Sequence, residues 1–174
     1  LRKEVLDLLL ARNNNSDTAG VASEMPHSVS RGADPNKRIV TIFGGSLGAK
    51  CINDAVIQMA STNKIFNFDL TLITGEKNFD SVSSHLKKSE NSNVNILPFS
   101  NNLFEMILNS DLVVSRAGAG TCVELEAAGV QSILIPLAIA PGDHQRKNAH
   151  DIVAKGNGVI LDEKDLNGTS LYSY

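Results

Sequence analysis

Residues 111–136 read DLVVSRAGAGTCVELEAAGVQSILIP, and this stretch decides the fold. Two short apolar runs, at 111–115 and 133–135, stand on either side of a glycine-rich turn and a segment suited to a helix. Continuous valine, isoleucine and leucine are typical of strands that are buried on both faces, as in a parallel sheet. Parallel neighbours need a long crossover, which is usually a helix. The stretch therefore predicts a strand–helix–strand unit.

The same alternation continues on both sides of this unit. Further strands are predicted at 38–43, 69–73, 94–97 and 158–161, and helices at 50–61, 77–88, 101–109, 121–128 and 143–155. The predicted fold is α/β, a Rossmann-like parallel sheet of about six strands with helices on both faces. This domain takes up residues 37–166, after a linker or short helix at 1–10 and a flexible loop at 11–36 rich in Asn and Ser; residues 167–174 are interpreted as a tail.

Composition excludes several classes of function. The chain has 174 residues, 42% of them hydrophobic, which suits one domain with a core of its own. Its net charge is −3, and its lysines and arginines form no stripe, which argues against a nucleic-acid partner. No acidic pair is spaced to hold a metal, and we expect neither metal nor cofactor. Cys51 and Cys122 lie in predicted helices without metal-ligand spacing, so we interpret them as free buried thiols.

Parallel sheets of this kind bind ligands beyond the carboxyl ends of their strands. We therefore looked for candidate binding residues in three of the loops that follow predicted strands. The first, at 44–49, reads GGSLGA and joins a strand to a helix. Glycines allow a ligand to approach the backbone, the amides at a helix N-terminus attract an anion, and Ser46 adds a hydroxyl. A tight turn that binds nothing explains the same residues equally well.

The second loop lies in the opening stretch. Gly118 and Gly120 free the turn, Thr121 is expected to begin the helix, and Glu124 follows on the same helical face. Thr121 and Glu124 have the spacing of a capping box, in which they would only satisfy backbone amides. A carboxylate at this place can equally accept two hydrogen bonds from a ribose diol. The sequence alone leaves both interpretations open.

The third loop, at 141–148, follows the fifth predicted strand. Asp143 is a candidate N-cap, and Gln145 and Asn148 share one helical face with His144 beside them. Their amides suit the hydroxyl groups of a sugar, although an ordinary polar helix start explains them too. Taken together, the three loops offer groups for a nucleotide diphosphate sugar at one edge of the sheet.

The motifs GGSLGA, SRAGAGTCVELEAAG and DHQRKNA, in this order and at these separations, resemble the MurG family of bacterial N-acetylglucosaminyltransferases. The resemblance covers most of the chain and implies the C-terminal, donor-binding half of a GT-B glycosyltransferase. In that family, N-acetylglucosamine passes from UDP-N-acetylglucosamine to lipid I, with inversion, to form lipid II in peptidoglycan synthesis. The fragment itself is then expected to be inactive.

The resemblance also implies roles for individual residues. Glu124 would bind the ribose hydroxyls, and the backbone near Ser100 would contact the uracil edge. Ser46 and the amides around Gly45, Gly120 and Thr121 would hold the diphosphate. The sugar hydroxyls would meet a group of residues made up of Ala119, His144, Gln145 and Asn148, and Arg2 would approach the nucleotide from the interdomain linker.

The resemblance further implies that an N-terminal acceptor domain, the catalytic base and the closing helices are absent from this chain. Lipid I and the membrane surface would be contacted through that missing domain, at the cytoplasmic face of the bacterial plasma membrane. Three rival interpretations remain. The first is another UDP-sugar transferase, and the second is a nicotinamide-dependent oxidoreductase with Glu76 on the adenine ribose. The third is a non-catalytic nucleotide-binding module of a split enzyme.

Overall fold

The structure of the protein is a computed structural model that describes residues 37–62, 66–87, 89, 93–138 and 141–174. The predicted linker or helix at 1–10 and the predicted loop at 11–36 lie outside the described residues, as does Arg2. No helix in the described part of the chain is both long enough and apolar enough to span a membrane.

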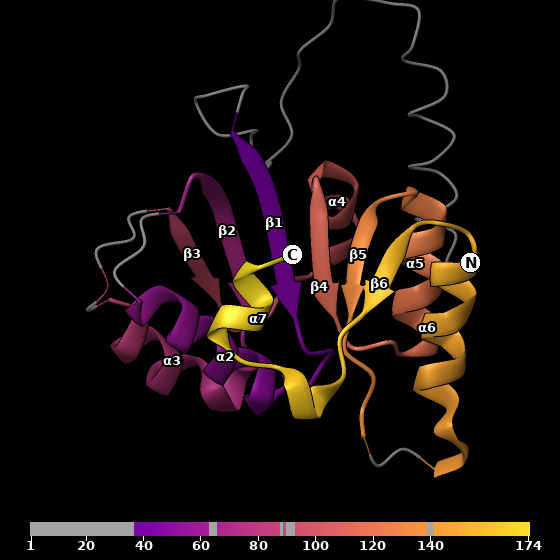
Figure 1. Ribbon diagram of the computed structural model, residues 1–174. Coiled ribbons are helices and arrows are strands. Elements are labelled where there is room, and N and C mark those ends of the chain that lie inside the picture. The colour runs from indigo at the N-terminus through magenta and orange to yellow at the C-terminus, as the bar shows by residue number, and fades with distance from the viewer. Residues whose placement is uncertain (1–36, 63–65, 88, 90–92, 139–140) are drawn as a thin grey trace, which may run out of the picture.

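A single sheet of six parallel strands forms the centre of the molecule, and its order is β3-β2-β1-β4-β5-β6 (Figure 1). The strands are β1 (Arg38–Phe43), β2 (Phe68–Ile73), β3 (Val94–Leu97), β4 (Leu112–Ser115), β5 (Gln131–Leu134) and β6 (Gly158–Ile160). The predicted α/β fold with a parallel sheet is confirmed. The chain builds outward from β1 in one direction and from β4 in the other, so the order reverses between these two neighbours. This reversal is where such sheets place their ligands.

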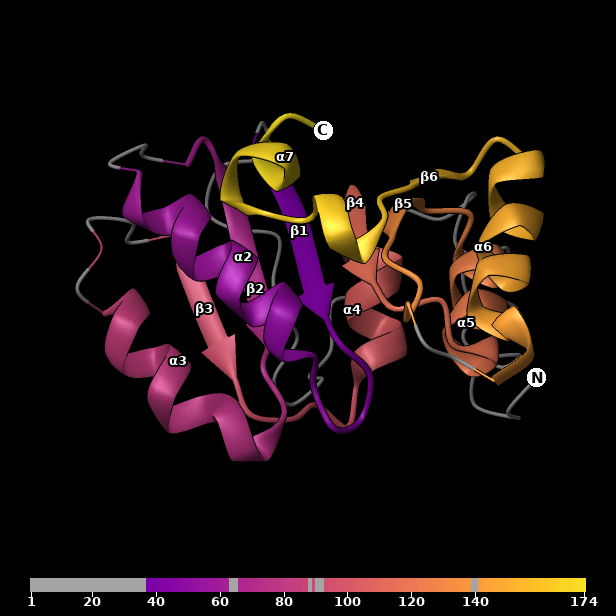
Figure 2. The same ribbon diagram turned by 60° about the horizontal axis from the view of Figure 1, so that its bottom comes forward.

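Helices cover both faces of the sheet (Figures 1 and 2). One face carries α2 (Lys50–Ser61), α3 (Phe79–Leu86) and α7 (Gly168–Tyr172), and the other carries α4 (Leu103–Asn109), α5 (Ala119–Ala128) and α6 (His144–Ala154). Three short 3-10 segments, η2 (Glu76–Asn78), η3 (Pro141–Asp143) and η4 (Glu163–Asp165), complete the connections. Helices α2 to α6 each lead into the next strand along the chain, as crossovers between parallel strands require.

The strands supply both hydrophobic cores at once because successive side chains point to opposite faces. In β4, Val114 packs in the cluster under α2, whereas its neighbour Val113 packs in the cluster under α4, α5 and α6. Ile52 and Ile107 are the fully buried helical partners on the two faces. Burial on both sides explains why the strands read as continuous apolar runs rather than as alternating patterns.

Several predicted boundaries differ from the structure by one or two residues, and the predicted tail contains a helix. Helix α5 begins at Ala119 rather than at 121, and β5 runs from Gln131 to Leu134 rather than over 133–135. Strand β5 starts early because its polar first residues pair in parallel with β4. The predicted tail at 167–174 instead contains α7, which begins with a capping box between Asn167 and Ser170 and buries Leu171 in the core. The spacing of Asn167 and Ser170, three residues apart, was the local signal for this helix start.

Candidate functional site

A cleft of about 730 Å³ opens at the carboxyl ends of the central strands. Its walls come from the ends of β1 and β2 and from the loops that follow β1, β3 and β4. The lining residues are Phe43, Gly45, Ser46, Ile73, Pro98, Phe99, Ser100, Asn101, Asn102, Leu103, Phe104, Glu105, Gly118, Gly120, Thr121 and Glu124. Six of the predicted binding residues therefore lie around one cavity, although their binding roles remain predictions. This cavity lies at the carboxyl edge of the sheet, as the loops predicted, and at the reversal of strand order between β1 and β4.

The loop after β1 approaches the turn after β2 backbone to backbone. Gly48 has φ of 74°, and a Cβ there would lie 2.0 Å from the carbonyl oxygen of Thr74. That oxygen is fixed in place, since it accepts hydrogen bonds from the side-chain amides of Asn53 and Asn78, both at 3.1 Å. This packing holds Gly45 and Ser46 at the cleft while α2 begins immediately behind them.

Helix α2 begins without a capping side chain. Its N-cap is Ala49, whose methyl group cannot accept a hydrogen bond from the first-turn amides. Uncapped amides at a helix start carry a partial positive charge and suit an anion. The uncapped start of α2 therefore supports the interpretation of residues 44–49 as an anion-binding loop, in addition to the glycines of that loop.

Helix α5 resolves the ambiguity that its sequence left open. Its N-cap is Gly118, and no side chain caps it, so Thr121 is the third residue of the helix. Thr121 and Glu124 therefore cannot form the capping box that the spacing allowed. Both line the cleft, and Glu124 is half-buried there. Glu126 points to a different face and pairs with Lys155, as the helical period predicted.

The loop after β3 forms the opposite wall of the cleft. The hydroxyl of Ser100 accepts a hydrogen bond from the backbone of Asn102 at 3.2 Å and donates one to the sulfur of Met106 at 3.3 Å. Beside it, the ring of Phe99 is 50% exposed although it is a large apolar group. The side chain of Ser100 is thus occupied in shaping the loop, which leaves its backbone as the part suited to a ligand.

The third predicted group stands apart from the cleft lining. His144 is exposed at the start of α6, and Ala119 is exposed at the start of α5. The side-chain oxygen of Gln145 accepts a hydrogen bond from the backbone of Leu137 at 3.0 Å. The side-chain nitrogen of Asn148 donates to the carbonyl of Ala117 at 3.1 Å. These bonds fix both amides, so that Gln145 offers its NH₂ group and Asn148 its carbonyl oxygen.

The structure also bears on two further sequence predictions, which concern Asp143 and Glu76. Asp143 does occupy the N-cap position of α6, but it adopts φ of 52° and its side chain makes no capping bond. A left-handed N-cap aims its side chain away from the first-turn amides, and the carboxylate lies 3.8 Å from Arg146 instead. Glu76, on which the oxidoreductase interpretation depends, is exposed in η2 and is not among the residues that line the cleft.

The two cysteines are free, with Cys122 buried and Cys51 half-buried. Burial raises the pKa of the Cys122 thiol to about 11, and burial likewise raises the pKa of Cys51. Both therefore keep their protons near neutral pH. Among the described residues, no group of three or more His, Cys, Asp or Glu side chains is arranged to hold a metal ion.

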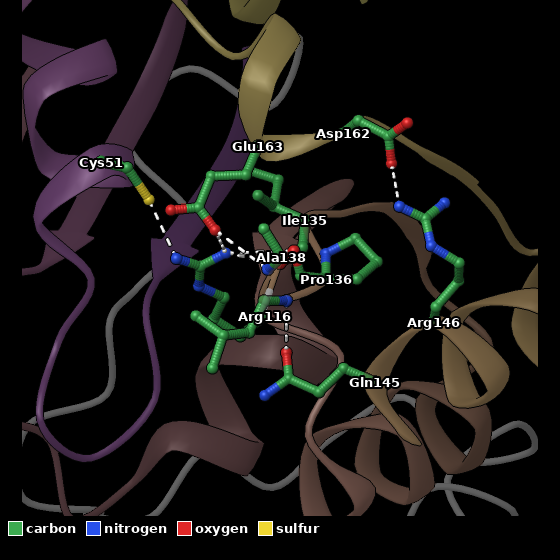
Figure 3. A network of polar contacts seen from close by, with 10 residues as sticks. Cys51, Arg116, Ile135, Pro136, Ala138, Gln145, Arg146, Asp162 and Glu163 are labelled. Atoms are coloured by element: carbon green, nitrogen blue, oxygen red, sulfur yellow. Dashed lines mark hydrogen bonds and ion pairs between the residues drawn. The ribbon is translucent and has the colours of Figure 1, made fainter. Parts of the chain in front are cut away.

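Beside the cleft lies a polar network that the sequence analysis missed (Figure 3). The guanidinium of Arg116, at the end of β4, donates to the carboxylate of Glu163 at 2.8 Å and to the sulfur of Cys51 at 3.0 Å. The arginine belongs to the SRAGAG motif, but its partner lies 47 residues further along the chain. An arginine directly after a buried strand was the available signal, because a buried charge requires a partner.

This network makes stability depend on pH. The hydrogen bond from Arg116 lowers the pKa of the Glu163 carboxyl, although partial burial opposes the shift. Such a group stabilises the fold fully above its unfolded pKa of about 4.3, and this contribution is lost as the pH falls through the lower, folded value. We expect the free energy of unfolding, measured in urea at several pH values, to fall more steeply below about pH 4.3 in the wild type than in Glu163→Gln. Identical slopes in the two proteins would contradict this.

Comparisons with known proteins agree with this geometry. The glycosyltransferase family 28 C-terminal domain matches residues 39–174. The UDP-N-acetylglucosamine–N-acetylmuramyl-(pentapeptide) pyrophosphoryl-undecaprenol N-acetylglucosamine transferase of Bacillus cytotoxicus is 45% identical over 141 residues, which make up 80% of this chain and 39% of that protein. The chain thus spans about two fifths of the length of such relatives.

Solved structures show the same fold. MurG of Acinetobacter baumannii matches with a TM-score of 0.71 and 27% identity, over 80% of this chain and 40% of that one. A glycotransferase of kitacinnamycin matches with a TM-score of 0.65 over 90% of this chain and 37% of that one, but at 18% identity the likeness concerns the fold alone. The resemblance to the MurG family and the expected GT-B C-terminal architecture are confirmed.

Proposed function

The chain belongs to the family of glycosyltransferase family 28 C-terminal domains, and from this premise we propose that it is the donor-binding half of an N-acetylglucosaminyltransferase. The complete enzyme would transfer N-acetylglucosamine from UDP-N-acetylglucosamine to lipid I and so form lipid II. The observation that carries the proposal is the cleft itself. The uncapped start of α5 and the loop that leads into the uncapped start of α2 line it together with Glu124.

Each wall suits one part of the donor. The amides near Gly45 and Thr121, with the hydroxyl of Ser46, would hold the diphosphate, and the support for this is that they line the cleft and that helix N-termini favour negative charge. Glu124 has a carboxylate for the two ribose hydroxyls, and the backbone near Ser100 suits the edge of a uracil ring. Gln145 and Asn148, outside the cleft lining, would meet the sugar that projects from it.

The reaction is the one that the resemblance to the MurG family implies. A hydroxyl oxygen of lipid I attacks the anomeric carbon, the bond from that carbon to the diphosphate oxygen breaks, and UDP leaves with the electron pair. Inversion follows because attack and departure are on opposite faces. The chain's contribution is to orient the donor and to stabilise the negative charge that grows on the departing diphosphate, which fixed amide dipoles do without reorganising.

The acceptor side of the reaction lies outside these residues. The base that takes the proton from the lipid I hydroxyl, the lipid I site and the membrane contact would all belong to the other part of the enzyme. We propose that the enzyme works at the cytoplasmic face of the plasma membrane as a peripheral protein. The chain alone would bind the donor and turn over nothing.

Calorimetric titration of the chain with UDP-N-acetylglucosamine, UDP-glucose and NADH tests the proposal. We expect the acetamido sugar nucleotide to bind more tightly than UDP-glucose, and NADH not to bind. Binding of NADH alone would favour the oxidoreductase interpretation and overturn ours. Transfer of the sugar to a lipid I analogue by the isolated chain would contradict the assignment of the base to the missing part.

A further inference from the structure

The segment between β5 and α6 is held by two charged side chains from distant parts of the chain. Arg116 donates to the carbonyl oxygens of Ile135, at 3.2 Å, and Pro136, at 3.3 Å. Glu163, from η4, accepts a hydrogen bond from the backbone of Ala138 at 3.3 Å while it pairs with Arg116 at 2.8 Å. We call Arg116 and Glu163 together the loop clamp (Figure 3).

The loop clamp is well placed to be rigid. The side chain of Arg116 is only 11% exposed and that of Glu163 27%, so water competes weakly for their hydrogen bonds. Arginine has five donors in a fixed planar fork, and here they reach two carbonyls, a carboxylate and the sulfur of Cys51. Three strand ends, those of β4, β5 and β6, are thereby tied to the first turn of α2.

The clamped backbone also holds a predicted sugar contact. Leu137 lies between the two clamped positions, Pro136 and Ala138, and its N–H donates to the side-chain oxygen of Gln145 at 3.0 Å. A backbone N–H can only donate, so this bond fixes Gln145 with its NH₂ group available as a donor. The clamp, the backbone at 136–138 and Gln145 therefore form one continuous chain of contacts (Figure 3).

We propose that Arg116 and Glu163 are positioning residues for the donor sugar, which act by holding the backbone at 135–138 and, through Leu137, the amide of Gln145. This inference rests on the proposed function, since it assumes that Gln145 faces the sugar of the bound nucleotide. The loop clamp is expected to affect binding of the sugar and not of the nucleotide. The proposed function places the nucleotide in the cleft, and neither Arg116 nor Glu163 lines it.

A neighbouring ion pair supplies a matched control. Arg146 donates to Asp162 at 2.5 Å, and Asp162 is adjacent to Glu163 with a similar side-chain exposure of 30%. That pair joins α6 to the segment after β6, and within the described part of the chain it makes no hydrogen bond to the backbone at 135–138 (Figure 3). If the clamp merely stabilised the fold, breaking either pair would have similar consequences for the ligand.

The test is calorimetry of the chain with UDP and with UDP-N-acetylglucosamine. In Glu163→Ala we expect the affinity for UDP-N-acetylglucosamine to fall about fivefold to tenfold, the loss expected for one misplaced hydrogen bond, and the affinity for UDP to change less than about twofold. Glu163→Gln, which can still accept both bonds, should recover most of the loss. Asp162→Ala should alter neither affinity by more than about twofold. In a Gln145→Ala background, Glu163→Ala should add almost nothing.

A second measurement covers the case in which Glu163→Ala does not fold. Hydrogen exchange of the Leu137 and Ala138 amides should be faster in Arg116→Lys than in the wild type, since lysine cannot span both carbonyls and the carboxylate. Equal exchange would overturn the inference. So would a wild type that binds UDP-N-acetylglucosamine while Glu163→Ala behaves as Asp162→Ala does. A wild type that binds neither nucleotide would overturn the proposed function, and this inference with it.

Discussion

Replacing Glu124 by alanine is expected to lower the affinity for UDP-N-acetylglucosamine about 100-fold. The reason is the loss of two hydrogen bonds between a carboxylate and the ribose diol, each worth about 1.5 kcal/mol or more because one partner is charged. Helix α5 should be little affected, since its N-cap is Gly118 and alanine is a good helix former. Calorimetry of the variant with UDP and with the sugar nucleotide should show equal losses, because both ligands carry the ribose.

The control for this variant is Glu126→Ala on the same helix. Glu126 is exposed, faces away from the cleft and pairs with Lys155, so its removal should leave both affinities within about twofold of the wild type. If Glu124→Ala instead binds normally but unfolds at a lower urea concentration, Glu124 stabilises the fold and has no part in binding. Equal effects of the two variants on affinity would also exclude the ribose assignment.

Gly48→Ala is expected to lower the free energy of unfolding by about 3 kcal/mol or more. Two costs add at this position. A non-glycine residue at φ of 74° is strained, and the new Cβ would lie 2.0 Å from the carbonyl oxygen of Thr74. The oxygen cannot move aside cheaply, because Asn53 and Asn78 both donate to it. Urea unfolding at equilibrium measures the loss directly.

Gly129→Ala separates these two costs. Gly129 ends α5 at φ of 62°, close to the value at Gly48, but a Cβ there would have no atom within 4 Å. We expect it to lose only about 1 kcal/mol, which is the strain alone. If both substitutions cost the same, the contact between the two loops is unimportant, and the loop after β1 is not held in place by the turn after β2.

Much of the candidate site could be located from the sequence because its positions are fixed by local pattern. A glycine-rich turn between a buried strand and a helix places its residues at the carboxyl edge of a parallel sheet, whichever strands are neighbours. Ser46, Thr121 and Glu124 were located in this way, and the structure brings them to one cleft. Boundaries were less predictable: α5 begins two residues before the predicted start because Gly118, and not a residue nearer Thr121, takes the extended backbone of the N-cap.

What the sequence by itself determined is therefore the class of fold and the edge of the sheet that carries the site, since both follow from the periods of strands and helices. Three features could be seen only in the tertiary structure. They are the order of the strands, the start of α5 at a position that excludes a capping box with Glu124, and the hydrogen bond from Arg116 to Glu163, 47 residues further along the chain. Local periodicity carries no information about which distant segments meet. Which distant segments come into contact is set by the packing of the two hydrophobic cores. A charged side chain that is buried in this packing then needs a partner among the residues that lie near it.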